Sequence, residues 1–151
     1  MRFAEFQSGA ELEFGSYEVS EEEILDFARR FDPQPFHLDR AAAAGSHWGG
    51  LIASGFHTCG IAMRLVATHV LAGSESMGSP GIEQLKWLQP VRPGDALRMR
   101  VQFIETTHSA SGRTGVLRWR WLLVNQRAQE VLDLVVTSLF DLRKRPGGRS
   151  A

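Results

Sequence analysis

The sequence predicts a single α+β domain in which an antiparallel sheet is wrapped on one long central helix. A chain of 151 residues suits one domain with one core. Residues 54–71 are small or apolar on almost every side of a helix, which indicates a buried helix. After residue 80, apolar and polar residues alternate in successive runs, as is typical of antiparallel strands with one face on the core. One buried helix and four or five such strands define the α+β class.

The N-terminal part is expected to contain a strand over residues 11–19 and then a helix. Ser20 and Glu23 have the spacing of a capping box, and apolar residues recur behind them at helical intervals. Asp32-Pro33 should end this helix, because proline cannot donate a backbone hydrogen bond and restricts the residue before it. A short second helix is predicted over Asp39–Ala44.

The predicted strands follow one another in the second half of the chain. Residues 73–79 are rich in glycine and serine and are expected to form a loop, and Arg92-Pro93-Gly94-Asp95 is expected to form a turn. Alternating runs predict strands over residues 81–88, 97–103, 117–123 and 132–140, with connecting turns at 108–115 and 125–129.

The long helix is expected to begin with Ser54 as its N-cap. Charged and titratable residues interrupt its apolar run, whereas a membrane span needs about 18 uninterrupted apolar residues. Gly55 and Gly60 each lower helix propensity by roughly 1 kcal/mol relative to alanine, so a sheet or a ligand is expected to approach the backbone closely. His57 suits a structural role and a ligand contact equally well. Trp48, in the glycine-rich connection before the helix, is expected on the surface.

Composition excludes several classes of protein. Hydrophobic residues make up 43% and charged residues 23% of the chain, which indicates a globular protein rather than a disordered one. Basic and acidic residues both number 17, so no overall basic surface for nucleic acid is expected. The lone Cys59 and the lack of an apolar N-terminal run favour a cytoplasmic protein that is not inserted in a membrane. The domain is predicted to span residues 1–142, and residues 143–151 are expected to form a disordered basic tail.

Phe31-Asp32-Pro33-Gln34-Pro35-Phe36-His37 is the strongest candidate for a catalytic segment. The two prolines predict that Asp32 and Gln34 are extended and that the segment is a rigid loop rather than a helix. A rigid loop that carries a carboxylate and an imidazole suits acid–base catalysis, which requires its groups to be held in place. The spacing alone favours the simpler alternative, a turn that ends the first helix, with Asp32 as a cap and His37 exposed.

The same residues resemble a known family. Asp32-Pro33-Gln34-Pro35-Phe36-His37 is similar to the Asp-x-Asn-Pro-x-His motif of the MaoC-like (R)-specific enoyl-CoA hydratases at the Asp, the second Pro and the His. The run from Gly50 to Gly55 resembles that family's approach to its central helix, and the run from Pro90 to Asp95 resembles its turn into the sheet. The resemblance extends from about Tyr17 to Phe103. Gln34 and Ser54 depart from it, because the family usually has Asn and often has His at these places.

The resemblance implies a hotdog fold and the reversible syn addition of water to a trans-2-enoyl thioester, which gives an (R)-3-hydroxyacyl thioester. His37 is expected to activate the water and Asp32 to be its partner and proton donor, with the division between them open because coupled groups share protons. The backbone N–H of Gly55, at a helix N-terminus, is expected to hold the thioester oxygen. Gln34, Ser54 and Phe56 are the other residues expected to bind the substrate.

The resemblance also implies a homodimer. The substrate would be an acyl-CoA thioester. No cofactor is expected beyond the coenzyme A that this substrate carries. No residues with the spacing of metal ligands are found in the sequence, so no metal site is predicted.

Two other functions are compatible with the residues. A thioesterase of the same fold would use the same helix N-terminus but direct water at the carbonyl carbon. A carboxylate on the central helix would favour that reaction, and residues 54–71 contain no Asp or Glu. A non-catalytic acyl-binding subunit would tolerate the loss of Asp32 or His37, and both are present.

Overall fold

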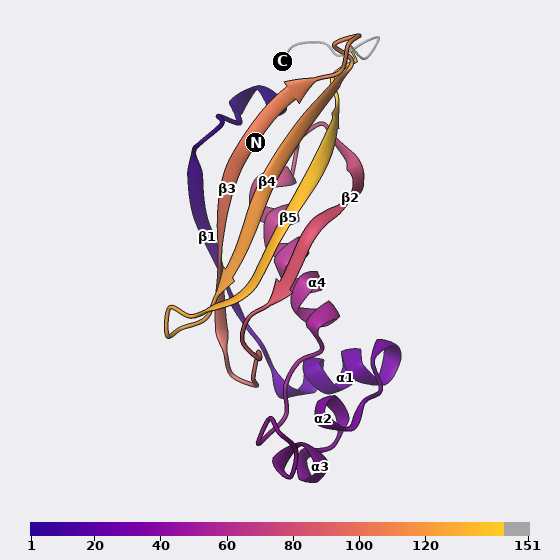
Figure 1. The fold of residues 1–151 in the computed structure, drawn as a ribbon, viewed down its shortest axis with the longest axis vertical. Helices are drawn as coiled ribbons and strands as arrows, with labels where there is room; N and C mark the ends of the chain where they lie inside the picture. Colours follow the sequence, from indigo (N-terminus) through magenta and orange to yellow (C-terminus); the bar gives the residue numbers. More distant parts are fainter. Residues whose placement is uncertain (144–151) are drawn as a thin grey trace.

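The computed structural model describes residues 1–143, so most of the expected basic tail, from residue 144 onward, lies outside the described residues. The described chain forms one five-stranded antiparallel sheet with the strand order β1-β3-β4-β5-β2 (Figure 1). The strands are β1 (Glu11–Glu18), β2 (Ser76–Trp87), β3 (Ala96–His108), β4 (Thr114–Val124) and β5 (Glu130–Asp141). The helix α4 (Gly55–Val66) runs along one face of this sheet and continues as the π-helical turn η2 (Ala67–Leu71). The predicted α+β hotdog architecture is therefore confirmed.

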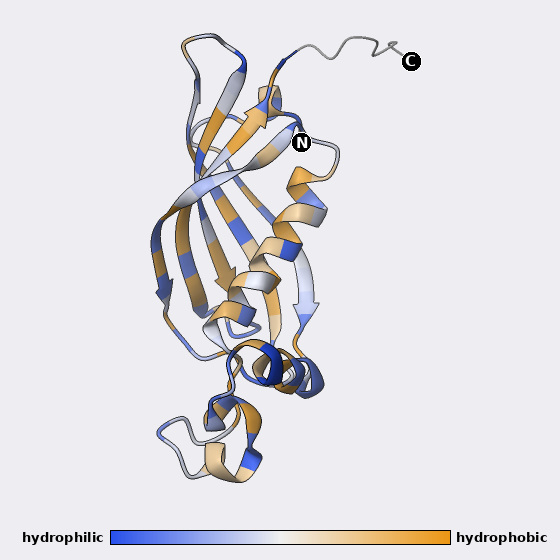
Figure 2. Ribbon diagram, turned by 90° about the vertical axis from the view of Figure 1, so that its right-hand side faces the viewer, coloured by the Kyte–Doolittle hydropathy of each residue, from blue (hydrophilic) through white to orange (hydrophobic). Residues whose placement is uncertain are grey.

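The core lies between α4 and the inner face of the sheet. Strand β3 buries every second residue from Leu97 to Phe103, as the alternation in its sequence predicts. Figure 2 shows the same alternation of hydrophobic and hydrophilic residues along the central strands. Trp119 of β4 is fully buried, and its indole N–H donates a hydrogen bond to the Ser138 hydroxyl at 3.0 Å. The sheet is thus held to the helix by side chains from one face only.

The expectation that α4 is buried on all sides is wrong for one side. Phe56 is 66% exposed and Met63 is 42% exposed, and a Cβ atom at Gly60 would meet nothing within 4 Å. The sheet covers one side of the helix, while Ile61 and Leu65 face the core. An apolar stripe of α4 is therefore left uncovered in the single chain.

Strand β2 begins earlier than the glycine- and serine-rich sequence predicts. It starts at Ser76 rather than after the expected loop, and its pairing with β5 is irregular at three places. Gly78 adopts a positive φ of 122°, a conformation that favours glycine. Pro80 fits because β2 is an edge strand, where one side of the backbone needs no partner strand.

Three helices form a cap beyond one end of the sheet (Figure 1). They are α1 (Glu21–Phe31), α2 (Pro35–Leu38) and α3 (Arg40–Ala44). Ser20 caps α1 by accepting a hydrogen bond from the Glu23 N–H at 3.1 Å. The predicted rigid loop is wrong in one respect, because α2 is a helical turn with Pro35 at its first position, where its fixed φ is already helical.

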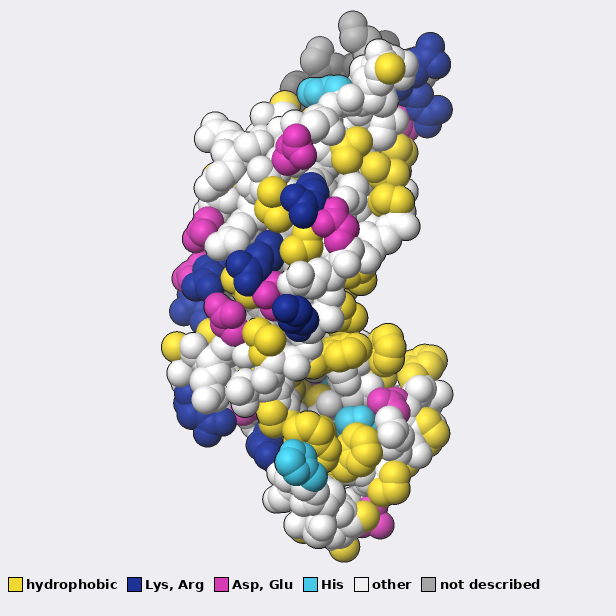
Figure 3. All heavy atoms as spheres, viewed as in Figure 1, with side chains coloured by type: hydrophobic (Ala, Val, Ile, Leu, Met, Phe, Trp, Pro, Cys, Tyr) yellow, Lys and Arg dark blue, Asp and Glu magenta, His cyan; other side chains and the backbone are white. Residues whose placement is uncertain are grey.

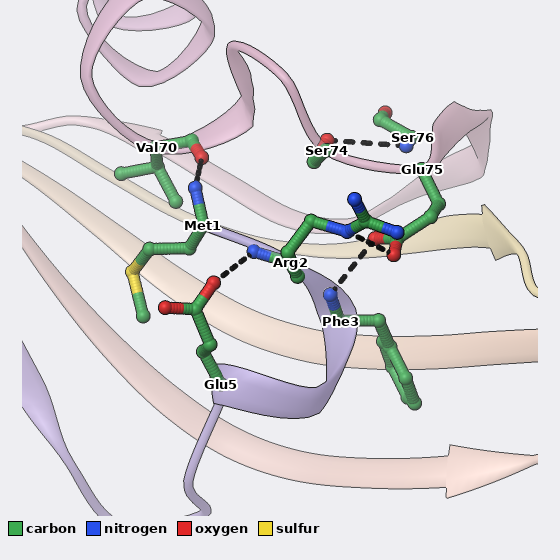
Figure 4. A network of polar contacts seen from close by, with 8 residues as sticks. All are labelled: Met1, Arg2, Phe3, Glu5, Val70, Ser74, Glu75 and Ser76. Atoms are coloured by element: carbon green, nitrogen blue, oxygen red, sulfur yellow. Dashed lines mark hydrogen bonds and ion pairs between the residues drawn. The ribbon is translucent and has the colours of Figure 1, made fainter. Parts of the chain in front are cut away.

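The N-terminus is fastened at the other end of α4 (Figure 4). The amino group of Met1 donates a hydrogen bond to the carbonyl of Val70, at the end of η2. The carboxylate of Glu75 accepts hydrogen bonds from the Arg2 side chain and from the Phe3 N–H, the latter at 2.9 Å. Phe3, in the 3-10 turn η1 (Phe3–Glu5), is buried against the sheet.

None of the helices in the described range has the length and apolar character needed to cross a bilayer.

Candidate active site

The structure brings Asp32 and His37 together at the junction of α1 and α2. The Nε2 atom of His37 lies 3.2 Å from the Oδ2 atom of Asp32. Asp32 ends α1 with an extended φ of −149°, and the helical turn after Pro35 points His37 back toward it. His37 is 4% exposed, so the alternative of an exposed histidine is wrong.

His37 has its orientation set by a backbone carbonyl. Its Nδ1 atom lies 2.7 Å from the carbonyl oxygen of Ile52, which comes just before α4. A carbonyl oxygen only accepts hydrogen bonds, so Nδ1 carries a proton. The other nitrogen, Nε2, is therefore the one that faces Asp32 and can exchange a proton.

Asp32 is held by three neighbours. The amide of Gln34 donates to Oδ1 at 2.6 Å, and the hydroxyl of Ser54 donates to Oδ2 at 2.7 Å. Burial raises the pKa of the Asp32 carboxyl, but these two hydrogen bonds together with the nearby His37 lower it overall. The ionised carboxylate is thus the favoured form.

Ser54 and Gln34, two of the residues expected to bind the substrate, both donate hydrogen bonds to the Asp32 carboxylate. Ser54 is fully buried, and its side chain makes no capping hydrogen bond to α4. Gln34 also lines the cavity described below, whereas Ser54 does not.

The N-terminus of α4 lies beside this pair. Gly55 is the first residue of the helix, so its N–H has no carbonyl partner within the helix. The space beside Gly55, which was expected to receive the thioester, holds the indole of Trp87: a Cβ atom at Gly55 would lie 2.4 Å from Cε2 of that ring. The indole N–H donates to the carbonyl oxygen of Gly55 at 2.9 Å. Gly55 therefore serves close packing against Trp87, and it also lines the cavity described below.

Asp32 and His37 open onto a cavity of about 320 Å³. Figure 3 shows a notch between the body of the sheet and the helical cap, with hydrophobic side chains gathered around it. Phe56 lies at the cavity and packs edge-on against Trp87, with ring centroids 5.6 Å apart. Trp48, expected on the surface, is 36% exposed and also lines the cavity. One further wall comes from the end of β2 and the segment after it, namely Trp87, Leu88, Gln89, Pro90 and Val91. Another comes from the helical cap, the segment before α4 and the start of α4, namely Phe36, Ile52, Ala53 and Thr58.

Trp87 and Ile52 are the site residues that the sequence did not identify. Trp87 is at the last position of a strand, and no local pattern places a strand end beside a helix start. Ile52 contributes its carbonyl group, which every residue has, so its side chain gives no signal. Within residues 1–143 there is no cluster of three or more metal-binding side chains.

A second histidine on α4, His57, has a structural environment. Its ring stacks on Phe27 of α1, with centroids 4.9 Å apart and planes 10° apart. Its Nε2 atom lies 3.6 Å from Oε1 of Glu23, and its Nδ1 atom is buried without a hydrogen-bond partner among the described residues. Burial lowers the pKa of His57, and the charge of Glu23 opposes this only in part. His57 joins α4 to α1 and does not line the cavity.

Comparisons with known proteins identify the family of this chain. Residues 5–118, more than half of the chain, match the MaoC-like domain. The chain is 34% identical to a MaoC-like dehydratase from Rhodospirillum rubrum, with a TM-score of 0.86, and the match covers 96% of this chain and 99% of that one. It is 28% identical to the uncharacterized protein YdeM of Bacillus subtilis over 88% of this chain and 94% of that protein. An (R)-hydratase from Pseudomonas aeruginosa, 22% identical, shares the fold with a TM-score of 0.70 over 99% of this chain and 96% of that one. The chain belongs to the MaoC-like domain family.

Proposed function

We propose that this protein is an (R)-specific enoyl-CoA hydratase, which in the reverse direction acts as a 3-hydroxyacyl-CoA dehydratase. The observation that carries the proposal is the 3.2 Å contact between Asp32 and His37 at a cavity beside the start of α4. Membership of the MaoC-like family supports the class of reaction. Acyl-CoA thioesters in the cytoplasm are the proposed substrates, with no cofactor other than the coenzyme A that they carry.

The contacts support one division of labour between the two residues. Asp32 is held in its ionised form, and its Oδ1 atom, which accepts a hydrogen bond from Gln34, has a further lone pair for a water molecule. Both ring nitrogens of His37 face acceptor oxygens, which suits a ring that donates protons. Asp32 is therefore the base and His37 the acid, the reverse of the division inferred from the sequence.

In this scheme Asp32 takes a proton from water as the water oxygen bonds to C3 of the enoyl group. The electron pair of the C2–C3 double bond moves toward the thioester, and the Nε2 proton of His37 passes to C2. The proton on Asp32 then returns to His37 across the 3.2 Å contact, which restores the starting state. Because both groups lie on the same side of the substrate, water adds with syn geometry.

The thioester oxygen gains negative charge during this step and needs a donor. The free N–H of Gly55 and the positive end of the α4 dipole are the groups proposed to supply it. The Ser54 hydroxyl donates to Asp32 and makes no side-chain cap at this end of the helix. A lost oxyanion donor is worth roughly 3–4 kcal/mol in the rate.

A homodimer is also proposed. Edge strand β2 is exposed along almost its whole length, and it borders the uncovered apolar stripe of α4. Exposed edges of this kind are usually paired or covered. A second copy pairing at β2 would cover both surfaces. Light scattering at micromolar concentration should therefore report twice the mass of the chain, and a stable monomer would contradict this proposal.

The decisive experiment is the hydration of crotonyl-CoA by the wild type and by Asp32→Asn. Loss of one member of an acid–base pair lowers the rate by about 10²–10⁴-fold. Asp26→Asn, an exposed carboxylate on α1 that pairs with Arg30, is the matched control and should keep the wild-type rate. Chiral analysis should identify the (R)-3-hydroxy product. Release of free coenzyme A without hydration would instead support a thioesterase, and near-wild-type hydration by folded Asp32→Asn would overturn the site.

A further inference from the structure

We propose that Trp87 limits the length of the acyl chain, so that short-chain enoyl thioesters are the substrates of this enzyme. This inference rests on the proposed function and adds the substrate class. It comes from two cavities that lie side by side along α4. One is the catalytic cavity, and the indole of Trp87 stands at the boundary between the two.

The second cavity, of about 440 Å³, is almost wholly apolar. It lies between α4 and β2, and its walls include Cys59, Gly60 and Met63 of α4 and Ile82 of β2. No residue of residues 1–143 lines both this cavity and the catalytic one. The apolar space that a long acyl chain would need is thus present, but it is separate from the space that contains Asp32 and His37.

Trp87 contacts one residue from each cavity. Its indole N–H donates to the carbonyl of Gly55, which lines the catalytic cavity, at 2.9 Å. Cys59 lines the apolar cavity, where burial raises the pKa of its thiol and the neighbouring Trp87 side chain opposes that rise. Gly55 and Cys59 lie about one turn apart on α4, since a turn contains 3.6 residues. The indole therefore lies across the helix where one cavity ends and the other begins.

Trp87 is 46% exposed, and its indole packs against the helix on its other side. Gly55 has no Cβ, which allows the ring to sit directly against the helix backbone. Phe56 packs edge-on against the ring, with centroids 5.6 Å apart. A long acyl chain could reach the apolar cavity only by displacing the ring, with loss of the hydrogen bond to Gly55 and of these contacts. A short chain ends before the ring and needs no displacement.

The first test compares kcat/KM for crotonyl-CoA and trans-2-octenoyl-CoA. The wild type should prefer the short substrate by at least about tenfold, the scale on which a closed apolar pocket discriminates between chain lengths. Trp87→Leu should reduce this preference at least about tenfold or reverse it, and Trp87→Phe, which keeps a ring, should retain most of it. Trp48→Leu removes an aromatic from another wall of the same cavity and should lower both rates while the ratio stays the same. Melting curves on each preparation establish which variants are folded.

A second measurement separates this inference from the proposed reaction. Butyryl-CoA and octanoyl-CoA have no double bond to hydrate, so their binding can be titrated whether or not the protein turns over. The wild type should bind octanoyl-CoA no more tightly than butyryl-CoA, and Trp87→Leu should bind octanoyl-CoA at least about tenfold more tightly than butyryl-CoA. Wild-type hydration of octenoyl-CoA as fast as crotonyl-CoA, or wild-type preference for octanoyl-CoA, would overturn the role of Trp87 and leave the hydratase intact. The reaction alone would be overturned if no substrate is hydrated while the preference between butyryl-CoA and octanoyl-CoA in binding still changes in Trp87→Leu. If Trp87→Leu does not fold, the wild-type ratios and Trp87→Met decide the question.

Discussion

Two histidine–carboxylate pairs lie near the start of α4 in space, and they differ in their hydrogen bonds and in their access to the cavity. In the pair of His37 and Asp32, the ring Nδ1 is bound to a carbonyl and Nε2 lies 3.2 Å from the carboxylate. In the pair of His57 and Glu23, Nδ1 has no partner among the described residues and Nε2 lies 3.6 Å from the carboxylate. Both histidines are buried. Proximity of an imidazole to a carboxylate is therefore not enough to identify a catalytic pair.

The two pairs differ in their access to the catalytic cavity and in the contacts that fix their side chains. Asp32 and His37 both line the catalytic cavity, and hydrogen bonds determine the position of each. His57 is instead stacked on Phe27, where its ring fills space between α1 and α4. The first pair can exchange protons with a bound molecule, and the second can affect only the packing of two helices. The predictions below test this distinction.

The largest expected effect is on the rate when each histidine is replaced. His37→Gln should lower crotonyl-CoA hydration by about 10²–10⁴-fold, because the proton donor is lost. His57→Phe keeps the stacked ring and should change the rate by less than about threefold, far below the loss expected for an acid–base group. Steady-state kinetics and melting curves on the same preparations measure both. Comparable rate losses in two folded variants would remove the distinction between the pairs.

An intermediate effect, on the pH dependence of the rate, is expected when Ser54 is replaced. The Ser54 hydroxyl binds Asp32 of the first pair. Ser54→Ala removes a hydrogen bond that favours the ionised Asp32, so the pKa of this carboxyl should rise. The acidic limb of the pH profile of kcat/KM should then move to higher pH, because activity requires ionised Asp32.

Thr58→Val is the matched control for this change. It also removes a buried hydroxyl next to Ser54, but that hydroxyl donates to the Ser54 carbonyl at 3.4 Å and not to Asp32. The acidic limb of Thr58→Val should stay at the wild-type position. A limb that stays in place in Ser54→Ala would show that the hydroxyl does not tune the carboxylate.

The smallest effect concerns stability and belongs to the second pair. Burial lowers the pKa of His57 in the folded protein, so below the unfolded value of about 6.5 the unfolded chain binds more protons than the folded one. The free energy of unfolding should therefore fall as the pH drops through this range. In His57→Phe that part of the loss should disappear. Denaturant unfolding at about pH 7.5 and pH 5.5 measures it, and an equal decrease in both proteins would show that His57 does not contribute.

Much of the fold and half of the site could be predicted from local sequence. The helix cap at Ser20, the end of α1 before Pro33 and the alternation in β3 each depend on residues within a few positions of one another. Asp32 and His37 are also only five residues apart, so the motif that they share with the MaoC-like family lies within one short segment, although the spacing alone left the position of His37 open.

The rest was decided by contacts between distant segments. The Ser54 hydroxyl binds Asp32 and does not cap its own helix. The indole of Trp87 fills the space beside Gly55 in which the substrate was expected. One side of α4 is uncovered although its composition is apolar all round, because the sheet of a single chain reaches only one side of it. Periodicity and spacing report which residues of one segment share a face. Which segment then packs against that face depends on how the whole chain folds, and only the tertiary structure contains this information.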